Sequence, residues 1–151
     1  MGYKSEVRCL IYGSKQDLDA FLTAQVLIGG STVLRDFKHQ LTRYTTWVYL
    51  DEVYPIEPNA QKKELHILDL HEPSTKWYED FPEVSAWMAF MEEAPEMGLQ
   101  FEFMRLGEER GDTEERNSEK PLGFLYTSQP EIMDDINKED EIPILFEGVT
   151  A

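Results

Sequence analysis

Four residues near the middle of the chain can bind a metal ion or transfer a proton: His66, Asp69, His71 and Glu72. Residues 64–70 predict a strand, on which residues of equal parity share a face, so Asp69 and His71 should point together and His66 away. Two ligands are fewer than the three or four of a zinc site, and no second histidine follows His71 at the spacing of a zincin helix. Polar residues at a strand end are the favoured interpretation.

A second group of reactive side chains lies in the charged stretch 107–121, which is expected to be a loop. Its carboxylates lack the Asp-x-Asp-x-Asp-Gly order of a calcium site, so a solvated loop is favoured over a cation site. A third interpretation is an interaction surface on which carboxylates replace phosphates. The loop acids are Glu108, Glu109, Asp112, Glu114 and Glu115, with Arg110 and Arg116 between them.

Other signatures of catalysis are missing from the sequence. Cys9 is the only cysteine, so it forms no internal disulfide, and its apolar strand favours a buried thiol over a nucleophile. There is no glycine-rich phosphate loop and no Gly-x-Ser-x-Gly elbow. We therefore predict a protein that is not an enzyme and needs no metal or cofactor.

Aromatic residues gather around the start of a predicted helix. The favoured interpretation is a hydrophobic core, with one or two rings as candidates for an interface anchor. They are Trp77, Tyr78, Phe81, Trp87 and Phe90.

The elements that must position these groups follow from hydrophobic periodicity. Helices are predicted at 15–28 and 82–94, and a shorter one follows the Gly29-Gly30 pair at 33–41. Their order with the strands is that of a split βαβ unit, which predicts an α+β, ferredoxin-like sandwich with a mainly antiparallel sheet and two or three helices on one face. The strands expected in that sheet are 5–12, 43–50, 64–70, 99–106 and an extra C-terminal one at 122–127.

Helix ends are marked by local signals. Ser14 with Asp17 resembles an N-cap, and Pro82 suits the first turn of a helix. Pro95 should stop or kink the second long helix near Glu93 or Ala94.

Length and tail composition predict one domain with an appendage. With 151 residues, we assign 1–128 to a single α+β domain and 129–151 to an acidic extension. A helical segment is expected around Ile132, Met133 and Ile136. The apolar run 142–146 should dock on the body or on a partner, because exposed it would be adhesive.

Charge is distributed unevenly along the chain. The net charge is −16, with +2 in residues 1–48 and −18 in residues 49–151. The acidic part should repel a phosphate backbone, so direct nucleic-acid binding is not expected. No apolar run reaches the roughly 18 residues of a membrane span. Charged residues interrupt the amino end, so we expect a cytoplasmic protein without membrane contact.

The sequence also resembles a group of small acidic proteins from bacteriophages and prophages. The likeness covers residues 2–128 and is carried by residues 76–84 (KWYEDFPEV), 98–103 (GLQFEF), 107–109 (GEE) and 2–7 (GYKSEV). Pro95 and the tail after Gln129 depart from it. The resemblance transfers no catalytic residue, and it implies a setting inside a bacterial cell, where such proteins bind and inhibit host proteins.

The leading hypothesis is a small acidic protein that binds a basic or nucleic-acid-binding host protein through a negative surface, imitating nucleic-acid charge. The alternatives are a cation-dependent enzyme using His71, Asp69 and the loop carboxylates, and a structural accessory protein that forms a homodimer. The predicted acidic surface consists of Glu92, Glu93, Glu96, Glu108, Glu109, Asp112, Glu114 and Glu115.

Overall fold

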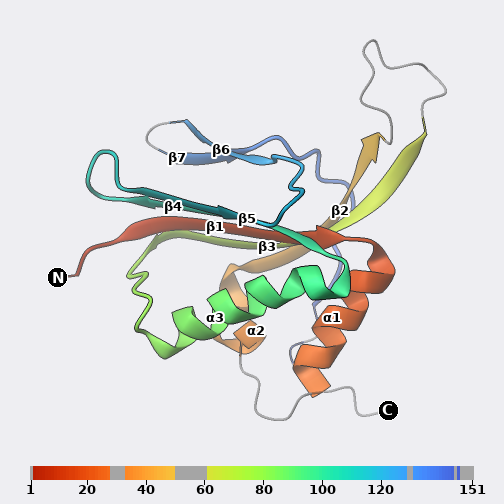
Figure 1. Cartoon of the computed structure of the whole chain (residues 1–151), viewed down its shortest axis with the longest axis horizontal. Coiled ribbons are helices and arrows are strands. Elements are labelled where there is room, and N and C mark those ends of the chain that lie inside the picture. Colours follow the sequence, from red (N-terminus) through yellow and green to blue (C-terminus); the bar gives the residue numbers. More distant parts are fainter. Residues whose placement is uncertain (1, 28–32, 50–60, 129–130, 145, 147–151) are drawn as a thin grey trace.

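Five antiparallel strands form the sheet on which the other elements pack (Figure 1). The structure is a computed structural model that describes residues 2–27, 33–49, 61–128, 131–144 and 146. The strand order is β2-β3-β1-β4-β5, which confirms an α+β protein with an antiparallel sheet. The strands are β1 (Ser5–Gly13), β2 (Leu41–Tyr49), β3 (Lys62–Thr75), β4 (Gln100–Gly107) and β5 (Thr113–Asn117).

Helices cover one face of the sheet (Figure 1). They are α1 (Lys15–Leu27), the short α2 (Val33–Asp36) and α3 (Pro82–Glu93), with 3-10 turns η1 (Lys38–Gln40) and η2 (Ala94–Met97). The amide of Asp17 donates to the Ser14 Oγ at 3.1 Å, which confirms the predicted N-cap. Pro82 begins α3, and Pro95 converts its end into a 3-10 turn that Gly98 closes with φ of 85°. We call this side of the sheet the helix face.

The core of the helix face is apolar. Val7, Cys9 and Ile11 alternate along β1 and pack in one cluster with the fully buried Trp87. Aromatic rings link the elements, since several pairs of ring centroids lie within about 6 Å. The predicted core role is therefore confirmed for Trp77, Trp87 and Phe90, which are buried, whereas Tyr78 and Phe81 are half-buried.

A two-stranded hairpin covers the opposite face of the sheet (Figure 1). Its strands are β6 (Leu125–Ser128) and β7 (Glu131–Asp134). Leu10 and Tyr12 of β1 lie beneath it in a second cluster that includes Ile132. We call this side the hairpin face. The central strand β1 is therefore buried on both faces.

The C-terminal segment continues along the edge of the sheet. The Glu139 amide donates to the Thr45 carbonyl at 2.8 Å, and the Thr45 amide donates to the Asp140 carbonyl at 2.9 Å. Ile144 and Phe146 then pack against the helix-face core. Residue 128, the predicted end of the domain, is the last residue of β6, so that boundary falls between two paired strands.

Three element predictions are wrong. The fifth strand of the sheet is β5, inside the stretch expected to be a loop, while 122–127 supplies the separate β6. The expected helix around Ile132 is the strand β7. The expected helix 33–41 is only α2 and η1, with Leu41 already in β2. Residue 28 of the first predicted helix and residue 50 of the second predicted strand lie outside the described residues.

Candidate interaction surface

The histidine and carboxylate group on β3 is divided among separate partners. Asp69 and His71 share the hairpin face and His66 lies on the helix face, as the strand period predicts. Asp69 is buried and accepts bonds from Arg8 at 2.6 and 2.8 Å and from the Tyr44 hydroxyl at 2.6 Å. Both Asp69 oxygens are therefore occupied by internal donors.

The two histidines of this group are also engaged. The His71 Nε2 lies 3.0 Å from Glu6, and the His66 Nε2 lies 3.0 Å from Glu64. No group of three or more histidine, cysteine or acidic side chains able to hold a metal occurs within the described ranges. Asp69, His66 and His71 are thus each held by different neighbours, and of these only Asp69 and His71 belong to the cation-dependent alternative.

Cys9 lies inside the helix-face core. Burial raises the pKa of its thiol well above the usual range, so the thiolate needed for nucleophilic attack does not form near neutral pH. Its Sγ lies 3.3 Å from the sulfur of Met91. Cys9 therefore acts as a small apolar side chain.

The eight residues of the predicted acidic surface lie on four segments of the chain. Glu92, Glu93 and Glu96 belong to the end of α3 and to η2, and the other five lie in the β4–β5 turn and on β5. Strand alternation separates Glu114, opposite Arg105 on the helix face, from Glu115, opposite Met104 on the hairpin face. Asp112 and Glu114 are half-buried, whereas the other six are exposed.

Two arginines cross-link part of this surface. Arg105 binds Asp112 at 2.8 Å and Glu114 at 3.2 Å. Arg116 binds Glu114 at 2.9 Å and reaches Glu92, at 3.2 Å, on α3. The network therefore ties β4 and β5 to the helix layer.

The amino-terminal segment and the connection before α3 complete the network. The Tyr3 hydroxyl donates to Asp112 at 2.7 Å, and Arg116 binds Glu79 at 2.8 Å. Arg105 followed by Tyr3 lowers the pKa of Asp112 to about 2, so this carboxylate stays charged far into the acid range. Sequence reasoning missed Tyr3, Glu79 and Arg105. One signal in the sequence could have identified Arg105. It follows Leu99, Phe101 and Phe103 at the same two-residue spacing, so a charged residue occupies the side of the strand that is otherwise apolar.

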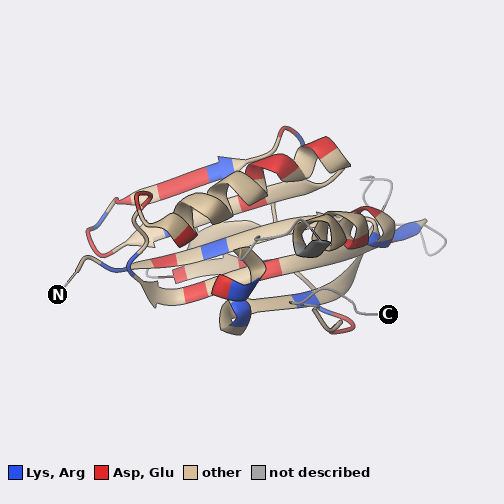
Figure 2. Cartoon of the chain, turned by 90° about the horizontal axis from the view of Figure 1, so that it is seen from below, with Lys and Arg blue, Asp and Glu red and all other residues tan. Residues whose placement is uncertain are grey.

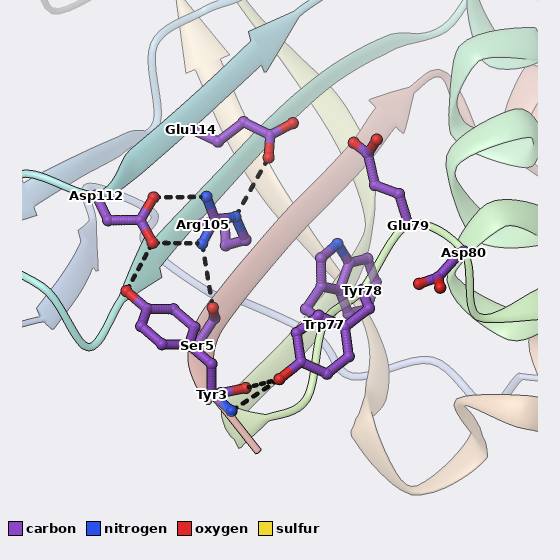
Figure 3. Close-up of a pocket in the computed structure, with 9 residues that line it drawn as sticks. All are labelled: Tyr3, Ser5, Trp77, Tyr78, Glu79, Asp80, Arg105, Asp112 and Glu114. Carbon is purple, nitrogen blue, oxygen red and sulfur yellow. Dashed lines mark hydrogen bonds and ion pairs between the residues drawn. The ribbon is translucent and has the colours of Figure 1, made fainter.

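A pocket of about 520 Å³ opens beside this network (Figure 3). It lies between the connection that precedes α3 and the β4–β5 hairpin. Aromatic side chains and carboxylates line it together with Arg105 at its wall. The lining residues are Tyr3, Ser5, Trp77, Tyr78, Glu79, Asp80, Arg105, Asp112 and Glu114.

Many acids of this region lack a basic neighbour. Residues 79–119 contain 13 acidic and 3 basic residues, a net charge of −10. Two of the three bases, Arg105 and Arg116, are used within the network. Within the described part of the chain, no ion pair engages Asp80, Glu83, Glu93, Glu96, Glu109 or Glu119, all of them exposed.

Comparisons with known proteins identify no relative of this chain. No family model matches the chain, and neither the curated proteins nor the solved structures compared with it contain a match. No helix in the described residues is long and apolar enough to cross a membrane. The strongest candidate for a functional site is the acidic surface with its adjoining pocket.

Proposed function

We propose that this protein binds a basic protein partner through its acidic surface and competes there with nucleic acid. The observation that carries the proposal is the net charge of −10 in residues 79–119, together with exposed carboxylates that have no internal cation within the described ranges. Exposed carboxylates in this number around the end of α3 and the β4–β5 hairpin create a negative potential that attracts a basic surface.

The placement of the bases supports this proposal. Figure 2 shows acidic segments along α3, on β5 and in the β4–β5 turn. Lys62 and Lys63 begin β3 at the end of the sheet opposite that turn (Figure 1). These two lysines thus lie away from the acidic turn, although Arg110 lies within it, and an uneven charge of this kind would orient an approaching partner as well as attract it.

The finer fold and the setting are part of the same proposal. The order β2-β3-β1-β4 with α1 and α3 on one face suits a ferredoxin-like sandwich to which β5 and the hairpin are added. The resemblance to phage and prophage proteins makes a nucleic-acid-binding host protein in the bacterial cytoplasm the partner class. On this view the protein is an inhibitor rather than an enzyme.

The test compares two variants with equal charge change. One replaces Glu93, Glu96, Glu109 and Glu115 by Lys, and its control replaces the exposed tail acids Asp135, Glu139, Asp140 and Glu141 by Lys. A partner captured by the wild type from bacterial lysate at low salt is identified by mass spectrometry and purified. Its association rate with each protein is then measured between about 50 and about 300 mM salt, a range over which the Debye length falls from above ~10 Å to below ~8 Å.

We expect the surface variant to associate at least about tenfold more slowly at low salt, and the control to change much less, because steering depends on where charge is placed. The wild type should also displace nucleic acid from the partner. An equal fall in association rate for both variants would mean that only the net charge of the protein matters. An unchanged rate in the surface variant would exclude this surface as the contact.

A further inference from the structure

The pocket beside the arginine network has an unbalanced charge. Its lining contains four carboxylates and one cation, Arg105. Arg116 approaches from outside the lining and binds Glu79 and Glu114. Counting both arginines, two negative charges remain, and Asp80 is exposed without a partner among the described residues. The pocket therefore lacks cations rather than anions.

Aromatic rings form the other part of its wall. Tyr3 and Tyr78 are half-buried and are joined to each other, because the Tyr3 amide donates to the Tyr78 hydroxyl at 2.7 Å. Tyr78 is also held by an edge contact with Phe81, whose ring centroid is 5.0 Å away. Trp77 also lines the pocket and is 7% exposed. Part of the wall is thus apolar, which a well-hydrated metal ion would not require.

The neighbouring arginines show which cation suits this environment. Asp112 engages two nitrogens of Arg105 at 2.8 and 3.2 Å, and Arg116 is shared by three carboxylates. A guanidinium is planar, donates several hydrogen bonds in fixed directions and stacks on aromatic rings, whereas an ammonium is a compact and strongly hydrated charge. The combination of carboxylates and tyrosine rings favours guanidinium.

We propose that this pocket receives an arginine side chain of the basic partner, with Glu79 and Asp80 facing the guanidinium and Tyr78 packing beside its aliphatic stem. The proposal rests on the proposed function, because it names the group that the acidic surface recognises. Figure 3 shows Glu79 and Asp80 on one side of Trp77 and Tyr78, and the Arg105 network with Tyr3 on the other. The incoming guanidinium would join those of Arg105 and Arg116 beside the pocket.

The test uses small probes on the intact protein. N-acetyl-arginine amide, the lysine equivalent and the uncharged citrulline equivalent are titrated while the indole N–H resonances are followed by NMR. We expect a saturable shift of the Trp77 resonance with the arginine probe, a weaker response to lysine and none to citrulline. Equal binding of lysine would overturn the assignment to guanidinium, and equal binding of citrulline, or no saturable shift, would overturn the cation pocket.

Two substitutions of equal chemistry locate the binding. Asp80→Asn should lower the affinity for the arginine probe about two- to fivefold, the range expected for an exposed charge pair. Asp135→Asn, at an exposed residue on the other side of the sheet, should leave that affinity unchanged. Equal effects of the two would overturn the proposal. If the probe fails but partner association still depends on Glu93, Glu96, Glu109 and Glu115, only the pocket is refuted. If the probe binds but the association rate with the partner does not depend on those four residues, only the proposed function is refuted.

Discussion

The two faces of the central sheet are covered by different kinds of interaction. On the helix face, β1 contributes Val7, Cys9 and Ile11 to a core of apolar and aromatic side chains. On the hairpin face, the same strand contributes Leu10 to a smaller apolar cluster, together with Arg8 and Tyr12, which are also buried but carry polar groups. Because adjacent residues of one strand point in opposite directions, the single strand β1 contributes to both kinds of packing.

Buried polar groups attach the hairpin to the sheet. Arg8 joins Asp69 on β3 to Asp134 on β7, with the second contact at 2.8 Å. Glu102 accepts the Tyr12 hydroxyl at 2.7 Å and two amides just before and within β6, those of Gly123 and Leu125, each at 3.1 Å. Hydrogen bonds are directional, so this network sets where the hairpin lies, whereas apolar packing on the other face mainly supplies stability.

The largest loss of stability should come from opening the helix-face core. Trp87 is fully buried and contacts Phe37 and Phe90, so Trp87→Ala should lower the free energy of unfolding by about 3–5 kcal/mol. Urea unfolding followed by circular dichroism measures the change. Trp47→Ala, at an exposed tryptophan on β2, is the control and should cost far less. Similar losses at both positions would contradict the assignment of the main core to this face.

Removing one partner of the buried ion pair should affect the other face. Asp69→Ala leaves Arg8 with Asp134 alone and the Tyr44 hydroxyl without its acceptor, so we expect a loss of about 3 kcal/mol. Hydrogen exchange should show β6 and β7 losing protection before α3 does. Replacing both Arg8 by Met and Asp69 by Leu should recover part of the stability, because no unpaired arginine remains at that position. An equal loss of hydrogen-exchange protection on both faces would contradict the view that this ion pair mainly holds the hairpin.

The carboxylate of Glu102 should matter through its acceptor oxygens. Glu102→Gln places an amide donor where Tyr12, Gly123 and Leu125 donate, and this mismatch should cost about 1–3 kcal/mol. Glu115→Gln on β5 is the matched control, since its exposed side chain faces the same side of the sheet, and it should change stability by less than about 0.5 kcal/mol. Equal free energies of unfolding for the two variants would show that Glu102 does not help to hold the hairpin on the sheet.

The smallest effect should come from the half-exposed network at the sheet edge. The pKa of Asp112 is about 2 when folded, below the ordinary aspartate value of about 3.9, so unfolding takes up a proton between these values. Its stabilising contribution is complete above about pH 4 and is lost as the pH falls toward 2. Asp112→Asn should therefore flatten the fall in stability between pH 4 and pH 2, measured by urea unfolding. Parallel pH profiles for variant and wild type would show that the edge network is electrostatically silent.

Local patterns in the sequence were sufficient where a segment carries its own periodicity. The strand at 5–12 and the helix beginning after Ser14 follow from alternation and capping, and Pro95 ends α3 as expected. The strand β5 escaped the same reasoning because Glu114, Glu115 and Arg116 contain no apolar residue. Its stability as a strand comes from pairing with β4, and no property of those residues alone reveals that pairing.

By itself, the sequence determined the charge of the molecule, the identity of its long elements and the opposite orientation of His66 to Asp69 and His71. Only the tertiary structure decided which acids are neutralised, because strand pairing brings Tyr3, Arg105 and Asp112 together across about a hundred residues of chain. It also decided that Asp69 belongs to a structural ion pair, since the hairpin that buries its neighbour Arg8 follows β3 by about fifty residues. Periodicity is a local property, whereas the partner of a charge depends on which distant strand lies beside it.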